Sequence, residues 1–312
     1  MIFKDDSLIM VSEGKSTLWG HASAFSAYLI FGFNIVACRN IALSGMVPPL
    51  SLFCFRATGA ALLFWMLSLS RPKANVEKKD LMKIFAASML GLFLTQITFL
   101  KAIGETTPVD CAVVASLTPI FTMFVSAIFI KEPITWKKSV GVMMSFCGVL
   151  YLIFNSVSAE GAVGQSSSFG IFLIVLNALF FASYLGIFRP LIAKYDAITF
   201  MKWMFLFSAI IADLLGLPEL VSLPYSRFPT DLTLTVVGVV FFSTFVAYLL
   251  VSNAQKLIRP TLVSLYSYVQ PIVASCLSIY LGMDLMTWQK IVAALLVFFG
   301  VAVVNGSKAR NA

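Results

Sequence analysis

The chain has 312 residues, of which 60% are hydrophobic and 12% charged, with a formal net charge of +8 at pH 7. Soluble domains carry about 25% charged residues, so this composition excludes a soluble globular fold. Crossing a bilayer takes roughly 20 apolar residues per helix. Ten stretches meet that length, near 18–38, 48–69, 82–101, 107–130, 135–154, 169–189, 199–217, 232–254, 261–282 and 286–305. We therefore expect an all-α integral membrane protein with ten transmembrane helices.

Lysine and arginine residues gather in alternate loops between these stretches. With the N-terminus in the cytoplasm, seventeen of them fall inside, four fall outside, and Arg56 lies within a span. Such a bias orients membrane proteins with their basic loops inside. Both termini are therefore expected in the cytoplasm. The basic residues act as topology signals, and we expect the lipid bilayer as a partner and no nucleic acid.

The order of the segments predicts one membrane domain in two halves. Residues 1–17 are expected as a cytoplasmic N-terminal tail, 18–154 as the first five-helix half, and 169–305 as the second. The segment 155–168 is rich in Gly and Ser and is expected as an external flexible linker. Residues 306–312 are expected as a cytoplasmic tail.

Arg56 follows the Pro48–Pro49 turn by seven to eight residues, which places it about 12 Å along its helix at 1.5 Å per residue. An arginine inside the membrane costs roughly 2.5–3.5 kcal/mol, so Arg56 is expected to face the bundle interior. Its guanidinium could bind the carboxylate or phosphate of a solute. Alternatively it could pair with Asp213, which the spacing also places in the outer half of the membrane. Both roles stay open.

The stretch from Thr107 to Val149 occurs twice in the chain. Moved forward by 152 positions without a gap, it lies on Arg259 to Val301. The matching residues include Pro108 and Pro260, Pro119 and Pro271, Trp136 and Trp288, Lys138 and Lys290, and Gly148 and Gly300. Duplication of a membrane unit is the usual construction of secondary transporters, which bind their substrate between the repeats.

Pro119 and Pro271 lie in the middle of equivalent spans. Each removes a backbone donor and leaves one carbonyl without its helical partner. We predict hinges beside a binding site, with static kinks as the alternative. The polar and aromatic residues around them are candidates for substrate contact: Ser116, Thr118, Tyr266, Tyr268 and Gln270.

Other polar and aromatic residues within the spans are further candidates, since such groups inside a membrane must face protein or water. Hydrogen bonding between helices is the alternative role of each. These residues are Tyr28, Asn34, Gln96, Asn177, Tyr184, Trp203 and Tyr248. The chain has one histidine, His21, five cysteines without a CxxC motif, and no P-loop. We therefore expect no enzyme activity, no cofactor and no metal ion.

Several short motifs resemble the EamA-type branch of the drug/metabolite transporter superfamily. They are Phe31–Ala37, Val47–Leu50 with Phe55–Arg56, Lys101–Ile103, Ser116–Pro119, Lys131–Thr135 and Gly148. Phe31 stands where the family pattern has tryptophan. The resemblance implies ten helices in two inverted five-helix repeats. An offset of five spans agrees with it, because an odd number of spans turns the second copy over.

We therefore predict a secondary transporter of a small organic metabolite, such as an amino acid or a related amphipathic solute. The resemblance implies export across a bacterial inner membrane, by alternating access through a cavity between the repeats. Asp110 and Asp213 lie toward the outer side, whereas a proton relay would need acids deeper in the membrane, so coupling to a proton or a counter-substrate stays open. The oligomeric state also stays open. The alternatives are a non-transporting membrane scaffold and an intramembrane enzyme, which would need paired acids or a histidine nearer the centre.

Overall fold

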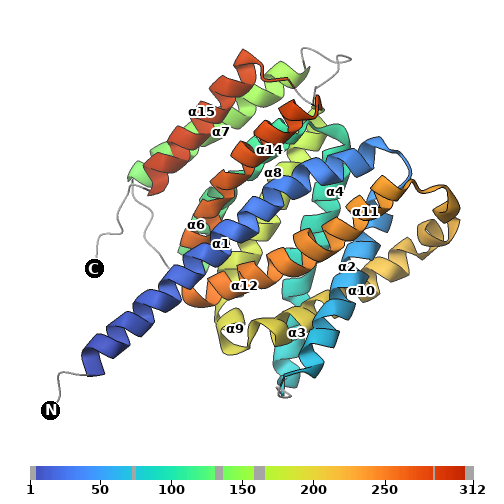
Figure 1. Cartoon of the computed structure of the whole chain (residues 1–312). Helices are drawn as coiled ribbons and strands as arrows, with labels where there is room; N and C mark the ends of the chain where they lie inside the picture. The colour runs from blue at the N-terminus through green and yellow to red at the C-terminus, as the bar shows by residue number, and fades with distance from the viewer. Residues whose placement is uncertain (1–4, 72–74, 131–135, 158–165, 284, 306–312) are drawn as a thin grey trace.

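The computed structural model describes residues 5–71, 75–130, 136–157, 166–283 and 285–305, and every regular element in these ranges is helical (Figure 1). The α-helices are α1 (Asp5–Leu43), α2 (Pro49–Leu69), α3 (Lys78–Ser88), α4 (Thr95–Glu105), α5 (Pro108–Ala115), α6 (Thr118–Ile130), α7 (Trp136–Val157), α8 (Ser168–Ile187), α9 (Arg189–Lys194), α10 (Ala197–Ser222), α11 (Thr230–Gly238), α12 (Ala247–Leu257), α13 (Pro260–Leu265), α14 (Val269–Tyr280) and α15 (Trp288–Asn305). Two π-helices and two short 3-10 helices complete the set: η1 (Met89–Leu94), η3 (Val239–Val246), η2 (Tyr225–Arg227) and η4 (Tyr266–Tyr268).

Eight segments are long and apolar enough to cross a membrane. They are Thr17–Leu43, Pro49–Leu69, Lys78–Glu105, Pro108–Phe129, Ser168–Ile187, Ala197–Ser222, Thr230–Leu257 and Leu262–Tyr280. Each coincides with a stretch predicted from the sequence. The other two predicted stretches contain shorter apolar helices, Ser139–Gly148 within α7 and Trp288–Gly300 within α15. The protein is therefore a multi-pass, all-helical membrane protein.

The polar N-terminal segment before the first span is helical from Asp5 onward. Helix α1 begins at Asp5 and continues without a break into the first span. No proline interrupts this stretch, so nothing ends the helix at the membrane boundary. Figure 1 shows this first part of α1 extending away from the other helices. Parts of the expected 155–168 linker, the Lys131–Thr135 turn and the C-terminal tail lie outside the described residues.

Helices from the two halves pack against each other throughout the bundle. Helix α1 packs against α12 and α14, α2 against α10, and α8 against α4 and α6. Helices α7 and α15 pair with each other along one side (Figure 1). The interior is therefore built from both halves at once, which places any central site at their junction.

The 152-residue offset also relates irregular backbone in the two halves. The span Lys78–Glu105 lies on Thr230–Leu257, and each contains a π-helix in its middle. The π-helices end at equivalent residues, Leu94 and Val246. At each π-helix, a threonine hydroxyl donates a hydrogen bond to the carbonyl five residues earlier. Thr95 Oγ1 donates to the Leu90 carbonyl at 2.6 Å, and Thr244 Oγ1 donates to the Val239 carbonyl at 2.9 Å. Such π-turns are frequent at functional sites.

Gly91 within η1 lets the Tyr184 ring of α8 approach the backbone. A Cβ atom at this position would lie 2.5 Å from Tyr184 Cγ, whereas one at Gly104 in the same span would meet nothing within 4 Å. We expect Gly91→Ala to destabilise the fold by roughly 1–3 kcal/mol through overpacking. The matched control Gly104→Ala should be neutral or stabilising by up to ~1 kcal/mol. Thermal unfolding of the purified variants in detergent measures both, and equal melting temperatures would contradict this packing.

Candidate functional site

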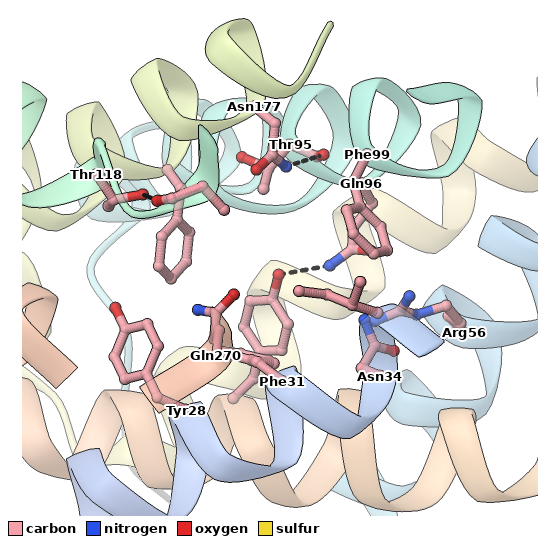
Figure 2. Close-up of a pocket in the computed structure, with 14 residues that line it drawn as sticks. Tyr28, Phe31, Asn34, Arg56, Thr95, Gln96, Phe99, Thr118, Asn177 and Gln270 are labelled. Carbon is pink, nitrogen blue, oxygen red and sulfur yellow. Dashed lines mark hydrogen bonds between the residues drawn. The ribbon is translucent and has the colours of Figure 1, made fainter. Parts of the chain in front are cut away.

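A cavity of about 70 Å³ lies between the two halves of the chain (Figure 2). Residues from α1, α2, α4, α5, α6, α8, α12 and α14 form its wall. Eight of the thirteen residues predicted to contact a substrate line it: Tyr28, Asn34, Arg56, Gln96, Thr118, Asn177, Tyr248 and Gln270. The cavity thus brings together polar side chains that lie more than two hundred residues apart in the sequence.

The other five predicted residues pack elsewhere. The Ser116 hydroxyl donates to the Val113 carbonyl, and the Tyr184 ring packs against Gly91 and Phe181. Trp203 packs against Trp65 and Phe207. Tyr266 bonds His21, and Tyr268 packs against Phe298. The sequence predicted that these residues lie within apolar spans. It could not tell which face of the helix they occupy, because these spans are apolar on every side.

Six further lining residues were not predicted: Phe31, Ile35, Thr95, Phe99, Ala115 and Phe181. Their side chains resemble those of the many lipid-facing residues in the chain. Helical spacing could have found three of them, since residues three or four apart share a face. Phe31 lies three residues from both Tyr28 and Asn34, Phe99 three after Gln96, and Phe181 four after Asn177.

Two pairs of lining residues occupy equivalent positions in the two halves. Gln96 and Tyr248 are 152 residues apart, and Gln96 Nε2 donates a hydrogen bond of 2.6 Å to the Tyr248 hydroxyl. Thr118 and Gln270 are separated by the same 152 residues and both line the cavity. The hydrogen bond of the Gln96 amide is drawn as a dashed line in Figure 2. The cavity therefore lies where the two copies of the repeated unit meet.

The helices that carry Thr118 and Gln270 are both interrupted just before a proline. Helix α5 ends at Ala115 and α6 begins at Thr118, whereas α13 and α14 are separated by the 3-10 turn η4. Pro119 has no N–H to bond the Ala115 carbonyl, and Thr118 Oγ1 donates to that carbonyl instead, at 2.7 Å. Breaks thus occur at equivalent places in both halves, as the prolines predicted.

Arg56 is the cationic residue of the cavity wall and is only 1% exposed. Its Nε donates to Thr244 Oγ1 at 2.9 Å, and its Nη1 lies 3.6 Å from Cys38 Sγ. The thiol of Cys38 in turn donates to Asn34 Oδ1 at 3.4 Å. Among the described residues, no carboxylate pairs with Arg56. Asp213, the expected alternative partner, instead accepts a hydrogen bond of 2.7 Å from the Thr58 hydroxyl.

Three buried polar atoms of the wall have no hydrogen-bond partner in the described part of the chain. They are Arg56 Nη2, Gln96 Oε1 and the Tyr28 hydroxyl. A buried polar group left unpaired costs about 1–3 kcal/mol. Water or a ligand would recover that free energy. The residues of the cavity wall therefore include a cationic donor, a neutral acceptor and a hydroxyl that the described part of the chain leaves without a partner.

Charged clusters tie helices together at the two ends of the span Lys78–Glu105. At its start, Asp80 accepts hydrogen bonds of 2.6 and 2.7 Å from Lys194 Nζ and the Tyr195 hydroxyl. Lys194 also contacts Glu77, an interaction that lowers the pKa of Glu77. The hydrogen bonds to Asp80 and Glu77 together raise the pKa of Lys194. Beyond the other end of the span, Asp110 joins two separate elements. It lies 3.6 Å from Lys290 Nζ of α15 and accepts a hydrogen bond of 2.6 Å from Ser166 Oγ.

Thr244 holds the Arg56 guanidinium, because its hydroxyl accepts from Arg56 Nε while donating to the Val239 carbonyl. We expect Thr244→Val, which keeps the shape and loses the hydroxyl, to destabilise the protein by roughly 1–3 kcal/mol. Thr244→Ser should recover most of this loss. In an Arg56→Gln background, Thr244→Val should cost less, because the guanidinium that needs the acceptor is absent. Thermal unfolding tests this, and an equal loss in both backgrounds would refute the role assigned to Thr244.

A model of the EamA-like transporter family matches the chain twice, over residues 18–154 and 168–306. The chain is also similar to two proteins of Bacillus subtilis (strain 168) named as uncharacterized transporters. It is 22% identical to YyaM over 284 residues, which covers 89% of this chain and 92% of YyaM. It is 25% identical to YetK over 273 residues, covering 85% of this chain and 80% of YetK.

A solved crystal structure has the same fold, with a TM-score of 0.63 and 18% sequence identity. The similarity covers 95% of this chain and 97% of that chain. The two matches of the family model take in nearly the whole sequence and include every residue of the cavity wall. The chain belongs to the EamA-like transporter family.

Proposed function

We propose that this protein is a secondary transporter that exports a small organic metabolite, an amino acid or a related amphipathic solute, from the bacterial cytoplasm. The observation that carries the proposal is the buried Arg56 guanidinium on the wall of a cavity between the two halves. A cation buried without a counter-charge is costly. Its free Nη2 donor suits a carboxylate, with which guanidinium groups form charge-assisted hydrogen bonds. The solute would thus supply the missing partner.

The proposed architecture has ten spans in two inverted five-helix repeats, with both termini in the cytoplasm. Eight spans by length and composition, together with α7 and α15 at the fifth and tenth positions, support this number. The equivalent π-helices and helix breaks support the repeat. The protein would lie in the cell membrane, which is the inner membrane where a bacterium has two.

Alternating access would use the broken helices and the charged clusters. The breaks before Pro119 and Pro271 provide places where a helix half can tilt without losing regular hydrogen bonds. The clusters around Asp80 and Asp110 tie the bundle at opposite ends of one span. We propose that the two clusters open in turn, so that the cavity faces one side of the membrane at a time.

A non-transporting scaffold is the rival function. A scaffold has no need of an open polar cavity, and its intramembrane polar groups would be expected to pair with one another. The three unpartnered polar atoms around one cavity favour the transporter instead. Protons or a counter-substrate are the possible coupling partners.

Efflux from liposomes tests the function directly. Purified protein is reconstituted in liposomes loaded with labelled amino acids and other small metabolites, and their release is followed. We expect the wild type to release some carboxylate-bearing solutes, and Arg56→Ala to slow that release by about tenfold or more, through loss of a charged hydrogen bond. Arg227→Ala, at an exposed arginine away from the cavity, is the control and should behave like the wild type.

Circular dichroism and gel filtration establish that each variant is folded. Equal release by wild type and a folded Arg56→Ala variant would assign Arg56 a structural role and leave transport standing. If no solute of the pool leaves faster than from loaded liposomes without protein, the result would count against transport and favour the scaffold.

A further inference from the structure

We infer that the transported solute is bound as a monoanion, with a carboxylate and a neutral hydrogen-bond donor beside it, and that the membrane potential drives its export. This inference rests on the proposed function and narrows it. Among the solutes that carry a carboxylate, it separates hydroxy or N-acylated acids, whose net charge is −1, from amino acids, which are zwitterions.

The charge of the cavity wall favours an anionic solute. Of its described lining residues, Arg56 is the one charged side chain, and no aspartate or glutamate is among them. The site therefore carries a single positive charge in a medium of low dielectric constant. A monoanion brings that charge to zero. A zwitterion leaves the net charge at +1 and adds a buried ammonium without a carboxylate to receive it.

The unpartnered atoms indicate which groups the solute carries beside one another. Arg56 Nη2 is a charged donor, and Gln96 Oε1 is a neutral acceptor whose amide nitrogen already bonds Tyr248. Figure 2 shows the Gln96 amide and the Arg56 guanidinium on the same side of the cavity. A solute with a carboxylate for Nη2 and an adjacent O–H or N–H for Oε1 satisfies both atoms. A neutral donor is sufficient for an amide oxygen, so the site has no need of an ammonium.

The aromatic residues receive the body of the solute. Tyr28 and Phe31 meet edge to face at a centroid distance of 5.7 Å, and so do Phe31 and Tyr248 at 5.6 Å. Because these rings pack on one another, they present a continuous apolar wall. An aliphatic or aromatic side chain fits such a wall, which favours an amphipathic acid over a small polar one.

The net charge also determines what drives transport. Cells keep the cytoplasm negative, and this potential pushes an anion outward. A transporter that carries one negative charge outward can therefore work without a proton relay. The described wall of the cavity has no titratable carboxylate for such a relay, and Asp213 is bonded to Thr58 away from it.

Four matched compounds test the charge preference. They are leucine, its 2-hydroxy acid analogue, and the amides of both, which vary the carboxylate and the ammonium independently while the isobutyl body stays the same. The phenylalanine series repeats the set with a larger body. Affinity is measured near neutral pH by calorimetry on the purified protein. We expect the hydroxy acid to bind at least about tenfold more tightly than the amino acid, and both amides more weakly still.

Efflux under an imposed potential tests the driving force. Liposomes loaded with the hydroxy acid are given an inside-negative or inside-positive potential with a potassium gradient and valinomycin. We expect inside-negative liposomes to release the hydroxy acid several-fold faster, whereas release of leucine should not respond. Arg56→Gln, which keeps a polar side chain without the charge, should abolish the preference for the anion.

The outcomes separate this inference from the proposed function. If leucine binds as tightly as its hydroxy acid, or if release of the hydroxy acid ignores the potential, the inference is wrong while transport stands. If no compound of either series binds or leaves faster than from protein-free liposomes while other solutes of the wider pool do leave, the inference is overturned and transport stands. If no solute of the wider pool leaves either, the proposed function is overturned as well.

Discussion

The position of one guanidinium depends on a single irregular turn of backbone. Arg56 is buried in the wall of a cavity inside a membrane protein, so its position depends on the few polar groups that the protein places around it. Thr244 supplies one, and its hydroxyl is oriented for this because it also donates to a carbonyl five residues earlier. In a regular α-helix that carbonyl would be bonded to the backbone N–H four residues later. The π-helix in the second half thus orients the hydroxyl that accepts the hydrogen bond of Arg56 Nε.

The first half contains a similar threonine hydrogen bond at its own π-helix, and there it is associated with Asn177. Thr95 donates to the carbonyl five residues before it, and its own carbonyl accepts a hydrogen bond of 2.7 Å from Asn177 Nδ2. Asn177 is thereby held in the cavity wall. Irregular backbone at membrane depth is tolerated only where protein or water satisfies it. Threonine hydroxyls bond carbonyls at both π-helices and at the break before Pro119, and two of these threonines, Thr95 and Thr118, line the cavity.

Eight of the ten apolar stretches predicted from the sequence coincide with helices long and apolar enough to cross a membrane, because twenty consecutive apolar residues leave few alternatives in a bilayer. The sequence also placed the helix breaks, since proline removes a donor wherever it lies. It did not predict the π-helices, because one extra residue in a turn leaves no mark on composition. Tyr184 and Trp203 show the other limit. Both were predicted to lie within spans, but the direction of their side chains depends on how uniformly apolar helices rotate against their neighbours, which packing alone decides. Phe31 and Phe99 were missed for another reason: only their helical spacing from predicted residues distinguishes them from the many other phenylalanines of the chain.

The hydrogen bond between Gln96 and Tyr248 bears on how such a protein diverges from its duplicated origin. In an assembly of two identical subunits, a position on the symmetry axis must hold the same residue twice. A symmetric dimer would have to place two glutamines, two tyrosines or two copies of another residue at such a position. Once the halves share one polypeptide, each side of the axis can change alone, and a donor can face an acceptor of another kind. Fusion therefore gives the centre of the molecule a chemical polarity that a symmetric dimer cannot have, and with it the means to orient an asymmetric molecule lying on the axis.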